Sequence, residues 1–236
     1  MNILDILAVA ILALSTAAGY YQGLLATTAN AAGVFVSLFS ANWLSVAAAQ
    51  SVKQADKVIP ALLYYSESAD MLGSVDNYRA SVTTMTQPAL ESILRTVQLP
   101  YPVDRWLSEN VLNLHYAGLG LTNLGDYLSR TIAETAVNIG CFLMLFFGIY
   151  LAVTLIVNLV HYVVKLPTLK ILDGFTGAVL GFGRGVILVL VVFMVLPVVL
   201  SMLPVAQVSE IVEGSQVAGL FYQKNFVLDM VRSYIP

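Results

Sequence analysis

The sequence predicts an all-α integral membrane protein with four transmembrane helices in two hairpins and an extracytoplasmic helical insertion between them. Of its 236 residues, 58% are hydrophobic and only 11% are charged, whereas about 25% of the residues in an average soluble domain are charged. Charged residues are also absent from three long runs, residues 6–52, 135–164 and 185–209. A helix of about 20 residues crosses the hydrocarbon core, so the first run is long enough for two crossings.

The first hairpin is expected at residues 1–48, with helices over about 3–21 and 24–47. Its turn is placed at residues 19–23, because the two glycines there permit a turn and the two tyrosines suit the headgroup level. A cleaved signal peptide is the alternative for the first helix, since residues 15–17 resemble a small-residue cleavage site. However, a signal peptide begins with a positive region, and no Lys or Arg precedes Lys53.

The second hairpin is expected at residues 135–204, where Pro197 should kink the last helix by removing a backbone donor. Four crossings put both termini on one side. The connection at residues 165–184 has three basic residues against the single acid Asp173, so the positive-inside rule predicts that it is cytoplasmic. The termini, the segment 49–134 and the tail 205–236 are then expected outside.

The segment 49–134 is expected to form a small helical cap, because apolar residues recur at helical spacing around Leu90 and Trp106 and prolines separate these stretches. Asp126, Arg130 and Glu134 follow at intervals of four residues. This spacing places them on one helix face, which we expect to be solvated.

Residues that could perform chemistry are scarce. No nucleophile, zinc-protease or phosphate-loop motif is present, and Cys141 is the single cysteine. His115 and His161 are far apart in the sequence; for His161, an interface anchor and a proton relay both remain open. A net charge of −3 offers no basic surface for nucleic acid. We therefore expect no enzymatic activity, no cofactor, no metal site and no nucleic-acid partner.

A stripe of small residues lies at the start of the last long apolar segment. Gly177, Gly181 and Gly185 recur every four residues, so in a helix they form one face on which another backbone can lie closely. Asp173 and Arg184 extend this stripe and are about 16 Å apart along a helix. They cannot pair with each other, so each needs a partner from another helix, a headgroup or water.

Two interpretations of Arg184 remain open. An ionisable side chain at membrane depth can line a substrate or ion path. Alternatively, the guanidinium reaches the cytoplasmic interface and fixes the helix there. In the first hairpin, Ser15, Gly19 and Gly23 have the same four-residue spacing and predict tight helix packing.

Together with Asp5, these motifs resemble the colicin V production protein (CvpA) family. The resemblance covers roughly residues 1–48 and 130–204 and touches Gly214 and Ser215; the segment 51–134 exceeds the compact family core and looks like an insertion. It implies a protein of the bacterial cytoplasmic (inner) membrane needed for production or export of a plasmid-borne toxin, or for envelope upkeep. The positions that match the family motif or are expected in helix packing are Gly19, Tyr20, Gly23, Asp173, Gly177, Gly181, Arg184 and Gly185.

Two functional hypotheses follow. The first is a membrane accessory that contacts the lipid bilayer and other membrane or export proteins, with self-association also possible. The alternative is a small solute transporter or channel subunit with a polar path lined by Asp173, Arg184, Asn30 and Asn158. The depth and surroundings of Arg184 distinguish the two hypotheses.

Overall fold

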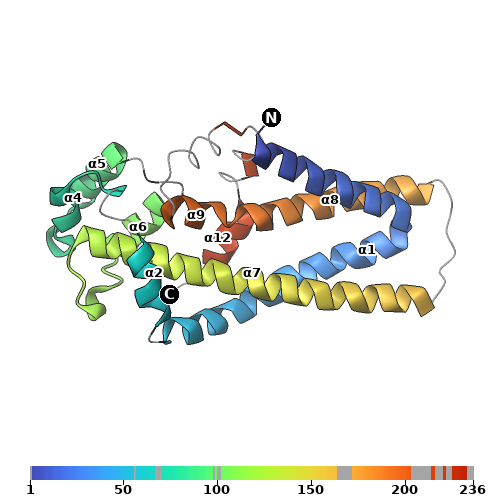
Figure 1. Ribbon diagram of the computed structural model, residues 1–236, viewed down its shortest axis with the longest axis horizontal. Helices are drawn as coiled ribbons and strands as arrows, with labels where there is room; N and C mark the ends of the chain where they lie inside the picture. Colours follow the sequence, from blue (N-terminus) through green and yellow to red (C-terminus); the bar gives the residue numbers. More distant parts are fainter. Residues whose placement is uncertain are drawn as a thin grey trace. The chain divides into compact units, whose positions relative to one another are not determined.

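A computed structural model describes residues 2–55, 57–66, 71–97, 99, 102–163, 172–202, 214–215, 220–221 and 225–232. Over these residues the chain is helical and has no β-strand, which confirms the all-α prediction. The α-helices, shown in Figure 1, are α1 (Ile3–Lys53), α2 (Val58–Tyr65), α4 (Val75–Arg79), α5 (Gln87–Val97), α6 (Val103–Leu112), α7 (Leu124–Val163), α8 (Leu172–Phe193), α9 (Leu196–Met202) and α12 (Phe226–Arg232).

Three helical stretches in the described part of the chain are long and apolar enough to cross a membrane. They are Ile3–Lys53, Leu124–Leu159 and Asp173–Met202. The last stretch is interrupted: α8 ends at Phe193 and α9 begins at Leu196. This interruption lies just before Pro197, where the sequence predicted a disturbance of the helix, because proline has no N–H to bond the carbonyl four residues earlier.

Helix α1 bends sharply at Gly23. This residue has φ 75° and ψ 177°, a non-helical conformation inside the helix that glycine adopts without steric cost. It lies within the turn predicted at residues 19–23. Figure 1 shows that α1 folds back at this point, so that it has a first arm, residues 3–22, and a second arm, residues 24–49.

The chain divides into two compact units. Unit 1 contains Met1–Ala49, Asn138–Met194 and Ile211–Pro236, and unit 2 contains Gln50–Val137 and Val195–Glu210. Of the segment predicted as a tail at 205–236, the structure describes residues 214–215, 220–221 and 225–232, and these belong to unit 1.

In unit 1, the buried face of α1 consists mainly of small and polar residues, whereas α7 and α8 also bury large side chains such as Phe142, Phe146 and Phe193. Trp43 on α1 is 77% exposed and Met144 on α7 is 81% exposed. In hydrocarbon such side chains are solvated by lipid, and small residues let helices approach closely. The buried face of the α1 arms includes Ala8, Ser15, Gly19, Ala26, Thr27, Asn30, Gly33, Ser37, Ala41, Ser45 and Ala49.

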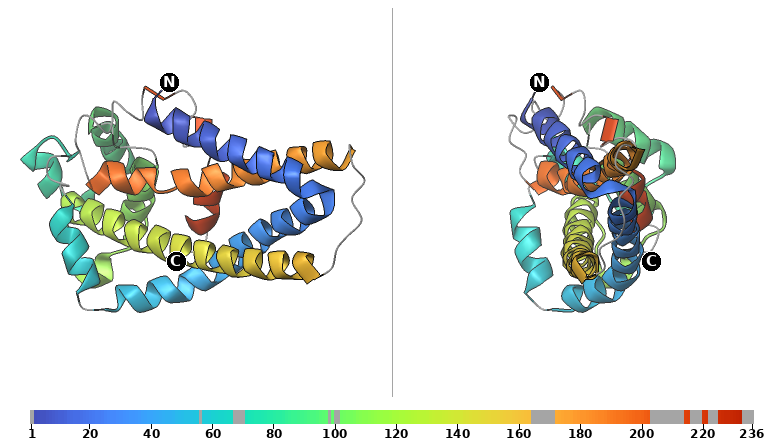
Figure 2. Two further views of the ribbon diagram at one scale, coloured as in Figure 1. Left: turned by 45° about the vertical axis from the view of Figure 1, so that its right-hand side comes forward. Right: turned by 90° about the vertical axis from the view of Figure 1, so that its right-hand side faces the viewer.

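Polar contacts bind C-terminal residues to the rest of unit 1. Helix α12 packs against α8, as the views in Figures 1 and 2 agree. The side-chain amide of Asn225 donates to the carbonyl of Leu190 at 2.8 Å, and the hydroxyl of Ser215 donates to Asp5 at 2.5 Å. Both contacts are buried, so they fix these C-terminal residues to α8 and to the start of α1.

Unit 2 has a conventional apolar core. Trp106 and Leu107 of α6 are buried together with Leu128 of α7. Tyr116 is buried beside Tyr127, with ring centroids 5.2 Å apart. Burial, together with the negative charge of Glu134, raises the pKa of Tyr116 well above its usual value.

Candidate functional site: the contact between α1 and α8

The first arm of α1 and helix α8 touch backbone to backbone. A Cβ built on Gly181 would lie 2.5 Å from the carbonyl oxygen of Ser15 and 3.1 Å from the Cα of Gly19. A Cβ on Gly19 would lie 2.9 Å from the Cα of Gly181. Side-chain atoms do not approach backbone this closely without a shift. Only glycine therefore fits at these two positions while the helices keep this separation.

The rest of the predicted stripe faces the same arm. A Cβ on Gly177 would collide with the carbonyl of Gly19, and one on Gly185 would lie 3.0 Å from the Cβ of Ser15. By contrast, Gly183 has nothing within 4 Å of such an atom. The stripe is thus a single face of α8 covered by α1.

Asp173 holds the bend of α1 from the neighbouring helix. Its Oδ1 accepts a hydrogen bond from the backbone N–H of Leu24 at 2.6 Å. The first N–H groups of a helix lack intrahelical acceptors, so this carboxylate of α8 caps the second arm of α1. A side chain at Gly23 would run into the same carboxylate, so the bend and the cap depend on each other.

Arg184 is buried in the contact between the helices. The residue is only 9% exposed, and its Nε donates to the hydroxyl of Ser15 at 3.1 Å. The same hydroxyl donates to the carbonyl of Gly181 at 2.7 Å. The structure therefore favours the interpretation in which Arg184 binds another helix over the one in which it anchors α8 at the headgroups. The hydrogen-bond partners of Asp173 and Arg184 both belong to α1.

The residues suggested for a polar path do not converge. Asn30 is buried and its amide donates to Gln22 at 3.0 Å. Asn158, in contrast, is exposed. Asp173 and Arg184 are about 16 Å apart along α8. Asn30, Asp173 and Arg184 thus make three separate hydrogen bonds, to Gln22, Leu24 and Ser15.

Tyr20 borders the contact. It is more than half exposed, and its ring lies 3.1 Å from where a Cβ of Gly174 would be. Thr27, which the sequence analysis missed, donates from its hydroxyl to the carbonyl of Gly19 at 3.1 Å and so bridges the bend. Thr27 lies four residues after Gly23 and so continues the spacing of small residues from Ser15. This spacing was the sequence feature that could have predicted its place in the contact.

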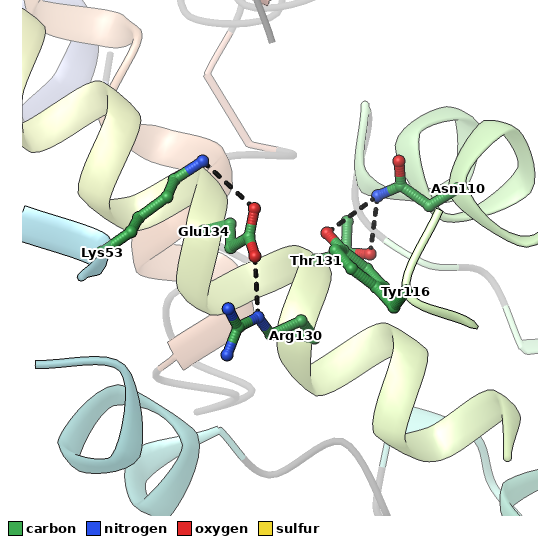
Figure 3. A network of polar contacts seen from close by, with 6 residues as sticks. All are labelled: Lys53, Asn110, Tyr116, Arg130, Thr131 and Glu134. Carbon is green, nitrogen blue, oxygen red and sulfur yellow. Dashed lines mark hydrogen bonds and ion pairs between the residues drawn. The ribbon is translucent and has the colours of Figure 1, made fainter. Parts of the chain in front are cut away.

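The expectation that Asp126, Arg130 and Glu134 form a solvated face is wrong for the last two residues. Glu134 accepts from Arg130 Nε at 2.7 Å and from Lys53 Nζ at 3.1 Å, and all three side chains are largely buried (Figure 3). The spacing predicted the pair within α7 but could not show that the end of α1 packs there. Asp126 is instead bound by the hydroxyl of Tyr78 at 3.0 Å.

Other candidate groups are isolated. His115 lies edge-on to Tyr116, and the side chain of His161, with Lys165 and Lys170, lies outside the described residues. Within the described ranges, no group of three or more His, Cys, Asp or Glu side chains could hold a metal ion.

These features define a multi-pass helical membrane protein whose first helix and α8 pack through glycine backbones. The family model for the colicin V production protein matches residues 106–225, and the chain belongs to that family. No curated protein and no solved structure matches the chain.

The matched range differs from the resemblance seen in the sequence. It contains the α8 motif from Asp173 to Gly185 and also Gly214 and Ser215, but it leaves residues 1–48 outside. It begins at Trp106, so the last part of the segment 51–134 belongs to the family match. The family match thus overlaps the end of the segment that was expected to be an insertion.

Replacing Gly181 with leucine should disrupt unit 1, because the side chain would enter the backbone of α1. We expect Gly181→Leu to lower stability by about 3 kcal/mol and to reduce the amount of protein in the membrane fraction. The matched control is Gly183→Leu, whose side chain enters open space. Thermal unfolding in detergent and membrane abundance measure the difference, and equal tolerance of both variants would contradict backbone contact.

Removing the cap at the bend should also destabilise the protein. Asp173→Ala leaves the N–H of Leu24 without its acceptor, with an expected loss of about 1 kcal/mol. Asp173→Asn keeps an oxygen that can accept this hydrogen bond and should retain most of the stability. Thermal unfolding of the two variants tests the assignment, which fails if alanine and asparagine have the same effect.

Proposed function

We propose that the protein is an accessory of the bacterial cytoplasmic membrane that acts in the production or export of a toxin such as colicin V, or in envelope upkeep, through contacts with other membrane or export proteins. Family membership supports the link to colicin V production. The observation that carries the proposal is the use of Asp173 and Arg184 in contacts between helices. Because these charged groups bind other parts of unit 1, we propose that the motif has a structural role. We propose further that no substrate is turned over.

The proposed topology has four crossings. Each arm of α1 contains about 20 or more residues, enough to cross about 30 Å of hydrocarbon, and Gly23 separates them. Helices α7 and α8 supply the other two crossings. The basic residues Lys165 and Lys170 favour a cytoplasmic connection between them. The termini and the segment 49–134 would then be extracytoplasmic.

Reporter fusions can test this topology. A reporter that is active only outside the cytoplasm should be active after residue 100 and inactive after residue 170, and a cytoplasmic reporter should show the reverse pattern. Expression of each fusion is checked by immunoblot. If the reporters fused after residues 100 and 170 were active in the same compartment, the proposed topology would be refuted.

A transporter or channel subunit remains the second candidate, and one observation favours it. Asn30 and Asn42 of α1 each have a buried carbonyl oxygen without a hydrogen-bond partner among the described residues, and Asn138 of α7 has such an amide nitrogen. These atoms lie in unit 1. Buried polar groups in a membrane helix can mark a path for ions or solutes.

Complementation combined with liposome flux separates the two candidates. In a toxin-producing strain that lacks its own copy, the wild-type chain and Gly183→Leu should restore toxin release, whereas Gly181→Leu should not. The purified wild-type protein in liposomes should conduct ions no faster than protein-free liposomes. Flux that requires Asn30 and Arg184, as shown by Asn30→Ala and Arg184→Gln, would instead support the transporter.

A further inference from the structure

The end of α1 and the first part of α7 form a cluster of two cations around one carboxylate. Lys53 Nζ lies 3.1 Å from one oxygen of Glu134, and Arg130 Nε lies 2.7 Å from the other oxygen. The side chains of Lys53, Arg130 and Glu134 are 19%, 21% and 11% exposed. Figure 3 shows both cations pointing to the same carboxylate. All three residues belong to unit 2.

The cluster has one positive charge in excess and unused donors. Both carboxylate oxygens of Glu134 are engaged, while Arg130 binds through Nε and keeps its terminal nitrogens. Within the described part of the chain, these terminal nitrogens have no acceptor. The next acid along α7, Asp126, accepts hydrogen bonds from Tyr78 and Asn123 instead. The cluster can therefore accept an oxyanion at its exposed edge.

The position of the cluster along the helices indicates its depth in the membrane. Lys53 directly follows the uncharged residues 6–52, and Glu134 directly precedes the uncharged residues 135–164. The ion pair between them thus joins the charged ends of two apolar segments. This is the level at which helices leave the hydrocarbon and meet lipid headgroups.

We propose that Lys53 and Arg130 bind the phosphate of an anionic membrane lipid, and that Glu134 orients the two cations. The planar guanidinium offers paired donors that match phosphate oxygens, and the ammonium adds a second charge. Partial burial strengthens these interactions relative to open water. The proposal rests on the proposed crossings of the second α1 arm and α7, but it holds for either orientation in the membrane.

Lipid binding to the purified full-length protein in detergent tests this site. Native mass spectrometry would follow titration with phosphatidylglycerol, with phosphatidylcholine and with inorganic phosphate. We expect Arg130→Met and Lys53→Met each to weaken phosphatidylglycerol binding about tenfold, the loss of one charged hydrogen bond. The control Arg105→Met removes an exposed cation of the same unit, paired with Glu109, and should leave binding unchanged.

Glu134→Gln distinguishes a binding site from a purely structural ion pair. Glutamine keeps an oxygen that can still orient one cation, but it lacks the negative charge that competes with the phosphate, so phosphatidylglycerol binding should become tighter than in the wild type. Weaker binding in a folded Glu134→Gln protein would overturn the proposal. If that variant does not fold, equal binding by Arg130→Met and Arg105→Met would overturn it.

The lipid titrations also identify the source of the phosphate. Inorganic phosphate that binds as tightly as phosphatidylglycerol would contradict a lipid site, and so would equal affinity for phosphatidylcholine. These results do not depend on the reporter fusions. Failure of the lipid site can therefore be distinguished from failure of the proposed topology.

Discussion

The close approach of two glycine backbones, at Gly19 of α1 and Gly181 of α8, is the constraint on which unit 1 depends. Most large apolar side chains of α1 point outward, where lipid solvates them as well as another helix would. Association between helices must therefore come from van der Waals packing and hydrogen bonds. The glycine contact allows close van der Waals packing of the two backbones. It also brings the carbonyl of Gly181 within hydrogen-bonding distance of the Ser15 hydroxyl.

The charged residues at the two ends of the α8 glycine stripe gain their roles from this contact. Arg184 can reach Ser15 because α1 lies against α8 at that level. Asp173 lies where the bend of α1 exposes the N–H of Leu24. In a low-dielectric environment such charge-assisted hydrogen bonds are strong, and an unpaired partner is costly. The motif thus combines close packing with two polar contacts that fix the register of the helices.

The sequence predicted the parts of this site that follow from local spacing. The recurrence of Gly177, Gly181 and Gly185 indicated a packing face, and only a glycine within residues 19–23 could adopt the positive φ found at Gly23. Contacts between distant residues could not be predicted in the same way. The pair Lys53 and Glu134 is separated by 81 positions, and the contact of Asn225 with Leu190 depends on where a short C-terminal helix packs.

Cysteine cross-linking in native membranes tests the central claim most directly. In a Cys141→Ser background, Ser15→Cys combined with Gly185→Cys should form a disulfide rapidly on oxidation, because the two Cβ positions are 3.0 Å apart and need to separate only slightly to reach the roughly 3.5–4.5 Å of a disulfide. Ser15→Cys combined with Gly183→Cys should remain reduced, since among the described residues no atom of α1 lies within 4 Å of the second position. Equal cross-linking of both pairs, or none in the first, would contradict the contact between α1 and α8.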